Sequence, residues 1–194
     1  MVKQIIDFDK YIKYAKQGPR YTSYPTAVEF SEKFTRKNYI EKLQNIDEDV
    51  PLSLYFHLPF CQSPCYFCGC SVVITSNEDK KTTYLEYLNK EMSLLKKYIN
   101  PKRKITKIHF GGGTPTYYSA SMLSKLLQDI KSAFPNLEDD AEISCEIDPR
   151  HFDEEKMKAL SSQGVNRVSY GVQDFDDKVQ VAINRVQPLE MTKN

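Results

Sequence analysis

The sequence predicts an α/β fold built from parallel strands, and more specifically a partial (β/α) barrel. From residue 51 onward, short apolar or alternating segments take turns with segments whose apolar residues recur every three or four positions. Strands and helices that alternate in this way form parallel strands joined by right-handed crossovers. About four such strand–helix units fit into residues 51–194. Residues 1–50 lack the pattern, so we expect them to form an N-terminal arm with short helices.

Four segments are predicted as strands, at residues 52–58, 105–110, 141–148 and 165–173. Side chains alternate across a strand, which gives a segment such as 52–58 one apolar and one polar face. The polar faces carry four chemically versatile side chains: Tyr55, His57, Glu146 and Gln173. These would project inward near the carboxyl ends of the strands, where barrel active sites gather. A barrel lined in this way would hold a polar ligand, whereas the alternative is an open sheet with one solvated face.

The segments between the predicted strands have the periodicity of helices. Residues 80–100 and the segment that stops at Pro135 each place apolar side chains on one helix face. A short helix near residues 153–162 ends at Gly164, which is a natural C-terminal cap. A further helix begins in residues 176–184.

In the arm, we expect an early helix and another near residues 36–46. Between them, the stretch GPRYTSYPT at residues 18–26 combines glycine and prolines with hydroxyl-bearing side chains. This composition indicates an ordered arm and not a core element.

The densest chemical signal is the cysteine cluster CQSPCYFCGC at residues 61–70. Cys61, Cys65 and Cys68 have the spacing C-x3-C-x2-C, and Cys70 follows two residues later. Thiolates are the usual protein ligands of iron–sulfur clusters, and three so close together can point at one centre. A cubane held by three of them has one iron without a protein ligand, and an open metal position is where catalysis takes place. We therefore predict an iron–sulfur cluster with these three cysteines as metal ligands.

Other uses of the cysteines fit less well. A structural zinc site needs paired C-x2-C units or a nearby histidine pair, and the sequence contains neither. A thioredoxin-like role for Cys65 and Cys68 leaves Cys61 idle. The first ten residues lack the apolar core of a signal peptide, and no run approaches the roughly 18 apolar residues of a membrane span. We therefore expect a cytoplasmic protein without disulfides, and the net charge of +1 argues against a nucleic-acid partner.

Six motifs, taken in chain order, resemble the oxygen-independent coproporphyrinogen III oxidase family of radical S-adenosylmethionine (SAM) enzymes. They are GPRYTSYPT, LYFHLPFCQSPCYFCGC, GGGTPT, EIDPR, GVQDF and INRVQ. The spacing of the three cysteines resembles the signature of the whole superfamily, whereas GPRYTSYPT and the fourth cysteine point to this branch. Related haem chaperones share the three cysteines but typically lack the last one. A chaperone of that kind is the alternative reading.

The resemblance implies roles for individual residues. Cys61, Cys65 and Cys68 would bind a [4Fe–4S] cluster whose open iron is chelated by SAM, and Cys70 would lie beside the cluster without ligating it. The positions that match SAM contacts of the family are Tyr55, Phe67, Gly112, Gly113, Thr114, Glu146, Gln173 and Arg185.

Simple chemistry supports several of these roles. A glycine run lets backbone N–H groups approach a ligand closely. Glu146 and Gln173 can accept hydrogen bonds from ammonium or ribose hydroxyl groups, and Arg185 can pair with a carboxylate. Taken singly, the glycines could form an ordinary βα turn and Arg185 could be a surface cation.

Residues outside these motifs have simpler interpretations. We expect Cys145 to be a small buried apolar residue, and His109 and His151 to be structural or exposed.

The implied reaction is an oxidative decarboxylation. A 5′-deoxyadenosyl radical made from SAM would abstract a hydrogen from a propionate of coproporphyrinogen III, which then loses CO2 and an electron. Repetition on a second propionate gives protoporphyrinogen IX. The resemblance also implies an unidentified low-potential electron donor and a full-length protein that is monomeric.

The family barrel has six strand–helix units followed by a C-terminal domain, whereas this sequence reaches Asn194 after about four. We therefore expect either a fragment of a longer enzyme or an inactive truncated remnant, with the fourth strand left as an open apolar edge.

Overall fold

The computed structural model describes residue 12 and residues 26–193, and the chain divides into two units, residues 1–39 and 40–194. The early helix and the stretch at 18–26 lie almost wholly outside the described residues, so both stay predictions. The described part of the first unit contains the 3-10 helix η1 (Ala27–Glu29) and the start of α2 (Arg36–Gln44). Thr35 and Asn38 form a capping box there, because the Thr35 amide donates to Asn38 Oδ1 (2.9 Å) and the Asn38 amide to Thr35 Oγ1 (3.4 Å). The helix expected near residues 36–46 is thus confirmed.

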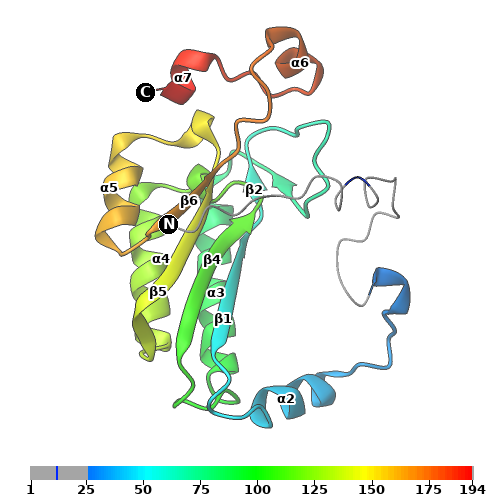
Figure 1. Ribbon diagram of the computed structural model, residues 1–194, viewed down its shortest axis with the longest axis vertical. Coiled ribbons are helices and arrows are strands. Elements are labelled where there is room, and N and C mark those ends of the chain that lie inside the picture. Colours follow the sequence, from blue (N-terminus) through cyan, green and yellow to red (C-terminus); the bar gives the residue numbers. More distant parts are fainter. Residues whose placement is uncertain (1–11, 13–25, 194) are drawn as a thin grey trace. The chain divides into compact units, whose positions relative to one another are not determined.

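The second unit is built on a sheet of four parallel strands in the order β1-β4-β5-β6 (Figure 1). The strands are β1 (Leu52–Leu58), β4 (Ile105–Gly112), β5 (Leu137–Ile147) and β6 (Arg167–Tyr170). Spatial order follows chain order, which is the arrangement expected in a (β/α) barrel. The predicted α/β fold with parallel strands is therefore confirmed.

Two strand boundaries differ from the sequence prediction. β5 begins at Leu137, which pairs with Ile105. This is four residues before the predicted start, because the polar run after Leu137 hides the strand pattern. β6 ends at Tyr170 although residues up to 173 were predicted as strand. The Gly171 amide still donates to the Ile147 carbonyl (2.8 Å), but the partner strand β5 ends at Ile147, and the Val172 amide turns back to the Tyr170 carbonyl (3.1 Å). Gln173 then takes a positive φ of 68°, outside strand geometry.

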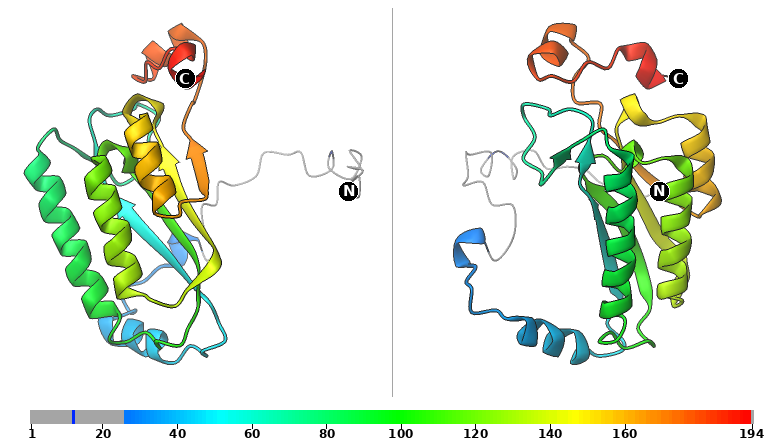
Figure 2. Two further views of the ribbon diagram at one scale, coloured as in Figure 1. Left: turned by 90° about the vertical axis from the view of Figure 1, so that its left-hand side faces the viewer. Right: turned by 180° about the vertical axis from the view of Figure 1, so that it is seen from behind.

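Three helices cover one face of the sheet: α3 (Glu78–Leu95), α4 (Ala120–Ala133) and α5 (Glu154–Ser162) (Figure 2). Each begins at a side chain that accepts a hydrogen bond from the first turn, namely Asn77, Ser119 and Asp153. Gly164, with a φ of 85°, follows α5 as predicted. α3 ends at Leu95, five residues before the predicted limit, and a turn follows it.

The core lies between the sheet and these helices. Its most deeply buried members, each at most 2% exposed, are Leu58, Ile105, Ile108, Phe110, Tyr118, Leu123, Leu126, Leu127, Ile130 and Cys145. Alternation along β1 sends Phe56 and Leu58 into this core, while Tyr55 is 59% exposed on the other face. β6 forms one edge of the sheet, where Val168 and Tyr170 are exposed, in line with the expected open edge.

The remaining elements lie at the carboxyl ends of the strands. They are the short strands β2 (Phe60–Cys61) and β3 (Val73–Ile74), the 3-10 helices η2 (Pro115–Tyr117) and η3 (Pro149–His151), and the helices α6 (Asp177–Ala182) and α7 (Leu189–Lys193). Among the described residues, no helix combines the length and apolar character needed to cross a membrane. Because barrel active sites gather at the carboxyl ends of the strands, functional side chains should be sought at this end of the sheet.

Candidate functional site

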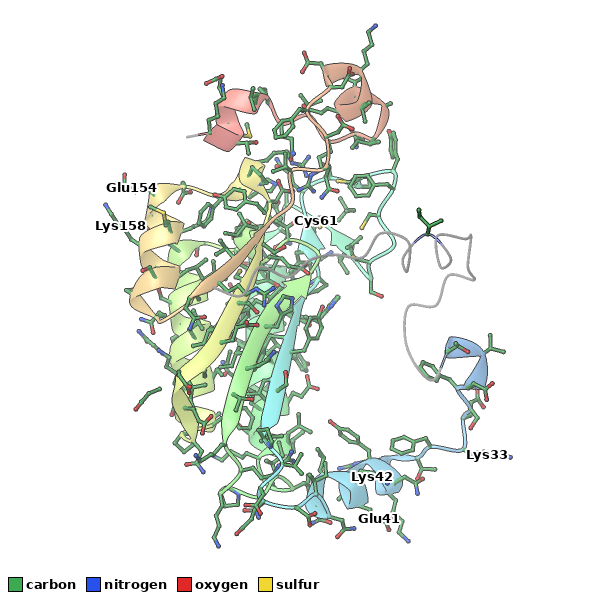
Figure 3. The ribbon with its side chains drawn as sticks, viewed as in Figure 1. Lys33, Glu41, Lys42, Cys61, Glu154 and Lys158 are labelled. Carbon is green, nitrogen blue, oxygen red and sulfur yellow. The ribbon has the colours of Figure 1, made fainter. Side chains whose placement is uncertain are left out.

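The cysteine loop leaves the carboxyl end of β1 and is closed at its base by the parallel pair β2–β3. The Val73 amide donates to the Pro59 carbonyl (2.8 Å), and the Thr75 amide to the Cys61 carbonyl (3.1 Å). Figure 3 shows Cys61 at this end of the sheet, away from the Glu154–Lys158 pair on the outer side of α5. Within the loop, the Cys68 amide donates to the Cys65 carbonyl (3.1 Å), a tight turn that brings these two cysteines to one side.

The far side of the cysteine loop is held by residues that follow α6. The Tyr66 amide donates to the Ile183 carbonyl (3.0 Å), and the Asn184 side-chain amide to the Pro64 carbonyl (2.7 Å). Asn184 has a φ of 55°, a conformation that asparagine tolerates better than most residues. Cys65 is therefore fixed from both sides by contacts with a distant part of the chain.

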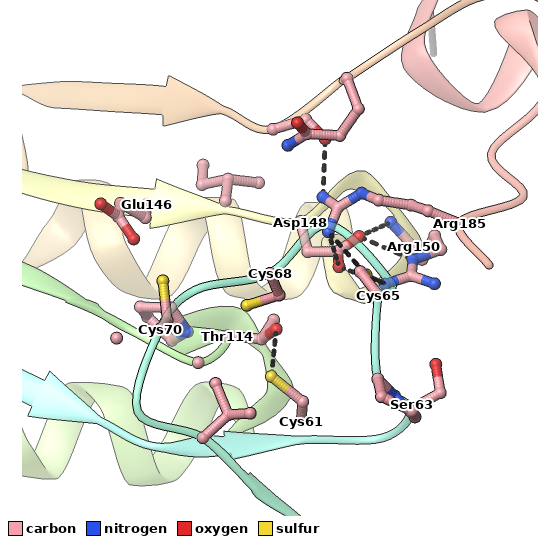
Figure 4. A pocket seen from close by; sticks show the side chains of 18 of the residues that line it. Cys61, Ser63, Cys65, Cys68, Cys70, Thr114, Glu146, Asp148, Arg150 and Arg185 are labelled. Atoms are coloured by element: carbon pink, nitrogen blue, oxygen red, sulfur yellow. Dashed lines mark hydrogen bonds and ion pairs between the residues drawn. The ribbon is translucent and has the colours of Figure 1, made fainter. Parts of the chain in front are cut away.

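These loops enclose a cavity of about 450 Å³ at the carboxyl ends of β4, β5 and β6 (Figure 4). Every predicted site residue except Tyr55 lines it: Cys61, Cys65, Cys68, Phe67, Gly112, Gly113, Thr114, Glu146, Gln173 and Arg185. Cys70 lines it as well. The fold thus brings together residues that are up to 124 positions apart in the sequence, as the distance from Cys61 to Arg185 shows (185 − 61).

The three predicted metal ligands face this cavity without meeting at one point. Within the described residues, no set of three His, Cys, Asp or Glu side chains is arranged to hold a single metal ion. Sulfur ligands of one zinc ion each lie about 2.3 Å from it and so stand close together. The ligands of a cubane bind different irons and stand farther apart. Three free thiols around one cavity therefore fit a cluster better than a single ion.

Cys61 lies against the glycine-rich turn after β4. Its sulfur is 3.3 Å from the Thr114 hydroxyl. The Gly113 amide donates to the Leu58 carbonyl (2.9 Å), so it is not free to bind a ligand. A Cβ atom on Gly113 would lie 2.5 Å from the Pro59 carbonyl oxygen and 3.0 Å from the Cys61 sulfur. Close packing of the turn on the cysteine loop therefore accounts for a glycine at this position.

Asp148, at the end of β5, holds two arginines beside Cys65. Its carboxylate accepts from Arg150 Nε (3.1 Å) and Nη2 (2.7 Å), and Arg185 Nη1 lies 3.1 Å from its Oδ2. Asp148 is buried, and burial alone would raise its pKa, but hydrogen bonds from Arg150 and the charge of Arg185 lower that pKa below its ordinary value. Both guanidinium groups also reach the Cys65 sulfur.

Arg185 is more heavily engaged than a residue free to bind a ligand carboxylate. Besides Asp148, its guanidinium donates to the Gly171 carbonyl (2.6 Å) and to Gln187 Oε1 (3.1 Å). The described structure thus gives Arg185 a bracing role across the site. Its predicted contact with SAM remains a prediction.

Sequence reasoning gave no role to Asp148 or Arg150, although both belong to the quoted motif EIDPR. The signal that could have found them is the position of Asp148 at the carboxyl end of a strand, on the same face as Glu146.

Tyr55 lies outside the cavity, on the exposed face of the sheet. Its hydroxyl is 3.0 Å from His57 Nδ1, and its ring stacks on His109 at 5.8 Å. Burial, together with the charges of Glu146 and Cys70, raises the pKa of Tyr55. His109 is partly buried and structural in its contacts, with Nδ1 2.8 Å from Ser144 Oγ and Nε2 3.5 Å from Glu146 Oε1.

The other cysteines and His151 behave as simple packing arguments suggest. Cys145 is 1% exposed in the core, and burial raises its pKa to about 12. Cys70 is exposed as a residue, but its thiol is partly shielded from water. This partial burial, together with the charge of the neighbouring Cys68, raises the pKa of Cys70. The ring of His151 packs at 5.0 Å from that of Tyr117.

Comparison with known proteins identifies the family of this chain. Residues 55–194 match the family model described as the radical SAM superfamily. A curated Helicobacter pylori protein, named oxygen-independent coproporphyrinogen III oxidase, is 53% identical over 98% of this chain and 42% of its own length. The Escherichia coli protein of the same name is 42% identical over 98% of this chain and 41% of its own length.

A solved structure of coproporphyrinogen III oxidase from Escherichia coli, described as a radical SAM enzyme, superimposes with a TM-score of 0.83. It is 40% identical and covers 94% of this chain and 40% of that protein. The chain thus spans about two fifths of the length of the relatives it matches.

Proposed function

Because this chain belongs to the radical SAM superfamily, which uses a [4Fe–4S] cluster and SAM, we propose that it provides the cofactor-binding part of an oxygen-independent coproporphyrinogen III oxidase. The reaction is the oxidative decarboxylation of coproporphyrinogen III to protoporphyrinogen IX. The relatives that bear this name match nearly the whole chain, which supports the choice of substrate.

The observation that carries the proposal is the shared cavity. Cys61, Cys65 and Cys68 line it beside Gly112 and Glu146, at the carboxyl ends of parallel strands. Three thiol ligands leave one iron for an outside ligand, and the cavity offers that ligand both polar and apolar walls. When bound, the reduced cluster and SAM supply the radical that removes a hydrogen from the substrate propionate.

In this scheme, the residues of the chain hold the cluster and SAM and orient them. Cys61, Cys65 and Cys68 are the metal ligands. Phe67, Gly112, Thr114, Glu146 and Gln173 face the cavity and contact SAM, with Glu146 and Gln173 as hydrogen-bond acceptors. Gly113 and Arg185 complete the SAM site, mainly by packing and by bracing it.

Tyr55 does not line the cavity, and its predicted contact with SAM stays a prediction. An unidentified low-potential donor supplies the electron. None of the five cysteines forms a disulfide, which suits the reducing cytoplasm, and we expect the full-length enzyme to be monomeric.

The cofactor proposal is tested by anaerobic reconstitution of the purified chain. We expect about four irons and four sulfides per chain, the content of a cubane. Cys61→Ala, Cys65→Ala and Cys68→Ala should each abolish the brown chromophore, whereas the matched control Cys70→Ala should keep it. Zinc without sulfide in the wild type, or loss of the chromophore in Cys70→Ala alone, would contradict the assignment.

The SAM site is tested on the reconstituted chain by EPR. Addition of SAM should change the spectrum of the reduced cluster, because SAM binds iron directly in this scheme. Glu146→Gln should reduce the change that SAM causes in the EPR spectrum, without changing the iron content of the chain. A spectrum that SAM leaves unchanged in the wild type would count against the site.

The substrate is tested with a chimera. Residues 1–194 replace the matched part of the Escherichia coli relative, which is 42% identical over that part. We expect the chimera to convert coproporphyrinogen III in the absence of oxygen. The product is then oxidised and measured by its porphyrin fluorescence. The same chimera with Cys61→Ala is the inactive control. A soluble, cluster-loaded chimera without turnover would contradict the proposed substrate.

A further inference from the structure

Two arginine side chains reach one of the three predicted ligand sulfurs. Arg150 Nη2 lies 3.8 Å from Cys65 Sγ, and Arg185 Nη1 lies 3.7 Å from it (Figure 4). In the part of the chain that the structure describes, Cys61 contacts the Thr114 hydroxyl instead, and no arginine contacts Cys68. The three sulfurs therefore differ in their electrostatic surroundings.

The two guanidinium groups are held in place by one carboxylate. Asp148, 4% exposed, takes a two-pronged pair from Arg150 and a third contact from Arg185. It also accepts from the Arg150 backbone amide (3.0 Å), which fixes the start of η3. Two cations around one anion leave a net charge of +1 beside Cys65, in a setting where water screens it weakly.

We propose that Arg150, positioned by Asp148, donates an N–H···S hydrogen bond to the Cys65 thiolate of the bound cluster and thereby raises the reduction potential of the cluster. The proposal rests on the proposed function, since it requires a cluster at Cys65. Reduction adds one electron to the cluster, and a nearby positive charge stabilises the form that carries the extra electron. Hydrogen bonds to the sulfurs and net charge are established determinants of such potentials.

Arg150 is the better arginine to test. Arg185 also braces Gly171 and Gln187 and is a predicted SAM contact, so its replacement would change several things at once. The side-chain hydrogen bonds of Arg150 go only to Asp148 and Cys65 in the described structure. After its removal, Asp148 would keep Arg185 as a partner at 3.1 Å, so the fold should tolerate the change.

The experiment is a redox titration of the reconstituted chain, followed by the EPR signal of the reduced cluster. Arg150→Met keeps an unbranched stem but removes the charge and the donors. At a fixed solution potential, we expect the ratio of reduced to oxidised cluster to fall about tenfold, which corresponds to about 59 mV for one electron. Arg150→Lys, which keeps the charge, should fall between Arg150→Met and the wild type.

Two further variants separate this effect from simple loss of structure. Arg150→Gln removes the charge and keeps a polar side chain, so the potential should fall as in Arg150→Met. Arg167→Met is the matched control, because Arg167 also pairs with a carboxylate, Glu142 at 2.9 Å, but its side chain is 65% exposed and contacts no cysteine. We expect its potential to equal that of the wild type.

The outcomes divide cleanly. A full iron and sulfide content in Arg150→Met with an unchanged potential overturns this inference and leaves the proposed function intact. An equal shift in Arg167→Met also overturns it. If Arg150→Met does not fold, Arg150→Gln decides, since an unchanged potential at full iron and sulfide content contradicts the electrostatic argument. A wild-type chain that assembles no cluster overturns both proposals.

Discussion

Replacement of Gly113 by alanine tests the packing of the glycine turn on the cysteine loop. The added Cβ would lie 2.5 Å from the Pro59 carbonyl oxygen and 2.6 Å from its carbon. That carbonyl accepts from the Val73 amide (2.8 Å), and the Gly113 amide donates to Leu58, so neither backbone can give way alone. Overpacking of this kind costs about 1–3 kcal/mol. In a chain of this size, that free energy lowers the melting temperature by about 2–12 °C.

The assay is thermal unfolding of the apo chain by circular dichroism, combined with iron content after reconstitution. Gly69→Ala is the matched control, because a Cβ on Gly69 meets nothing within 4 Å although the residue lies in the same cysteine loop. We expect Gly69→Ala to melt at or slightly above the wild-type temperature. Gly113→Ala should also load less iron, since its Cβ would lie 3.0 Å from the Cys61 sulfur. Equal melting temperatures for the two variants would refute the reasoning.

Three further predictions concern other parts of the site. Burial lowers the pKa of His151, so the unfolded chain takes up a proton first and the free energy of unfolding should fall as pH drops below about 6.5. His151→Phe should flatten this slope in urea titrations at pH 5 and 8, and an unchanged slope would contradict the burial argument. Asn184→Ala loses the bond to the Pro64 carbonyl and puts alanine at a φ of 55°, which should cost about 2 kcal/mol by urea unfolding. Asn184→Gly should lose only about half of that free energy of unfolding, because glycine tolerates the positive φ. Equal losses in the two variants would show that the backbone conformation at residue 184 contributes nothing. Iodoacetamide should label four thiols of the native apo chain and spare Cys145, which is 1% exposed with its pKa raised to about 12, until the chain is unfolded. A fifth label on the native chain, seen by mass spectrometry, would show that the core opens readily.

The fold could be predicted from the sequence because its signals are local. Alternation in β1 and the three- and four-residue spacing in α4 each depend on a single element, and Pro135 and Gly164 mark ends through their own backbone preferences. The cysteine signature was also visible in the sequence, since its three predicted ligands lie within eight residues of one another (61–68). Parallel order then placed the strand ends, and their loops, at one edge.

What could not be predicted depends on contacts between distant side chains. The pairing of Asp148 with Arg185 follows from the path of the segment after β6, which no periodicity describes. The early end of β6 follows from the end of its partner β5 at Ile147 and from the bond of the Val172 amide to the Tyr170 carbonyl, neither of which the residue pattern announces. Gly113 was assigned to ligand approach because its true neighbour, the Pro59 carbonyl, lies 54 positions away (113 − 59).

The bond from Asn184 to the Pro64 carbonyl joins residues 120 positions apart. During synthesis, the cysteines emerge from the ribosome long before the segment that secures them. Until Ile183 and Asn184 have left the ribosome and docked, the far side of the cysteine loop lacks its two anchors. Contacts of such sequence separation form late, because the intervening chain must be ordered first. Cofactor loading should therefore follow folding of the sheet, and the nascent thiols must be protected from oxygen or stray metals for as long as that takes.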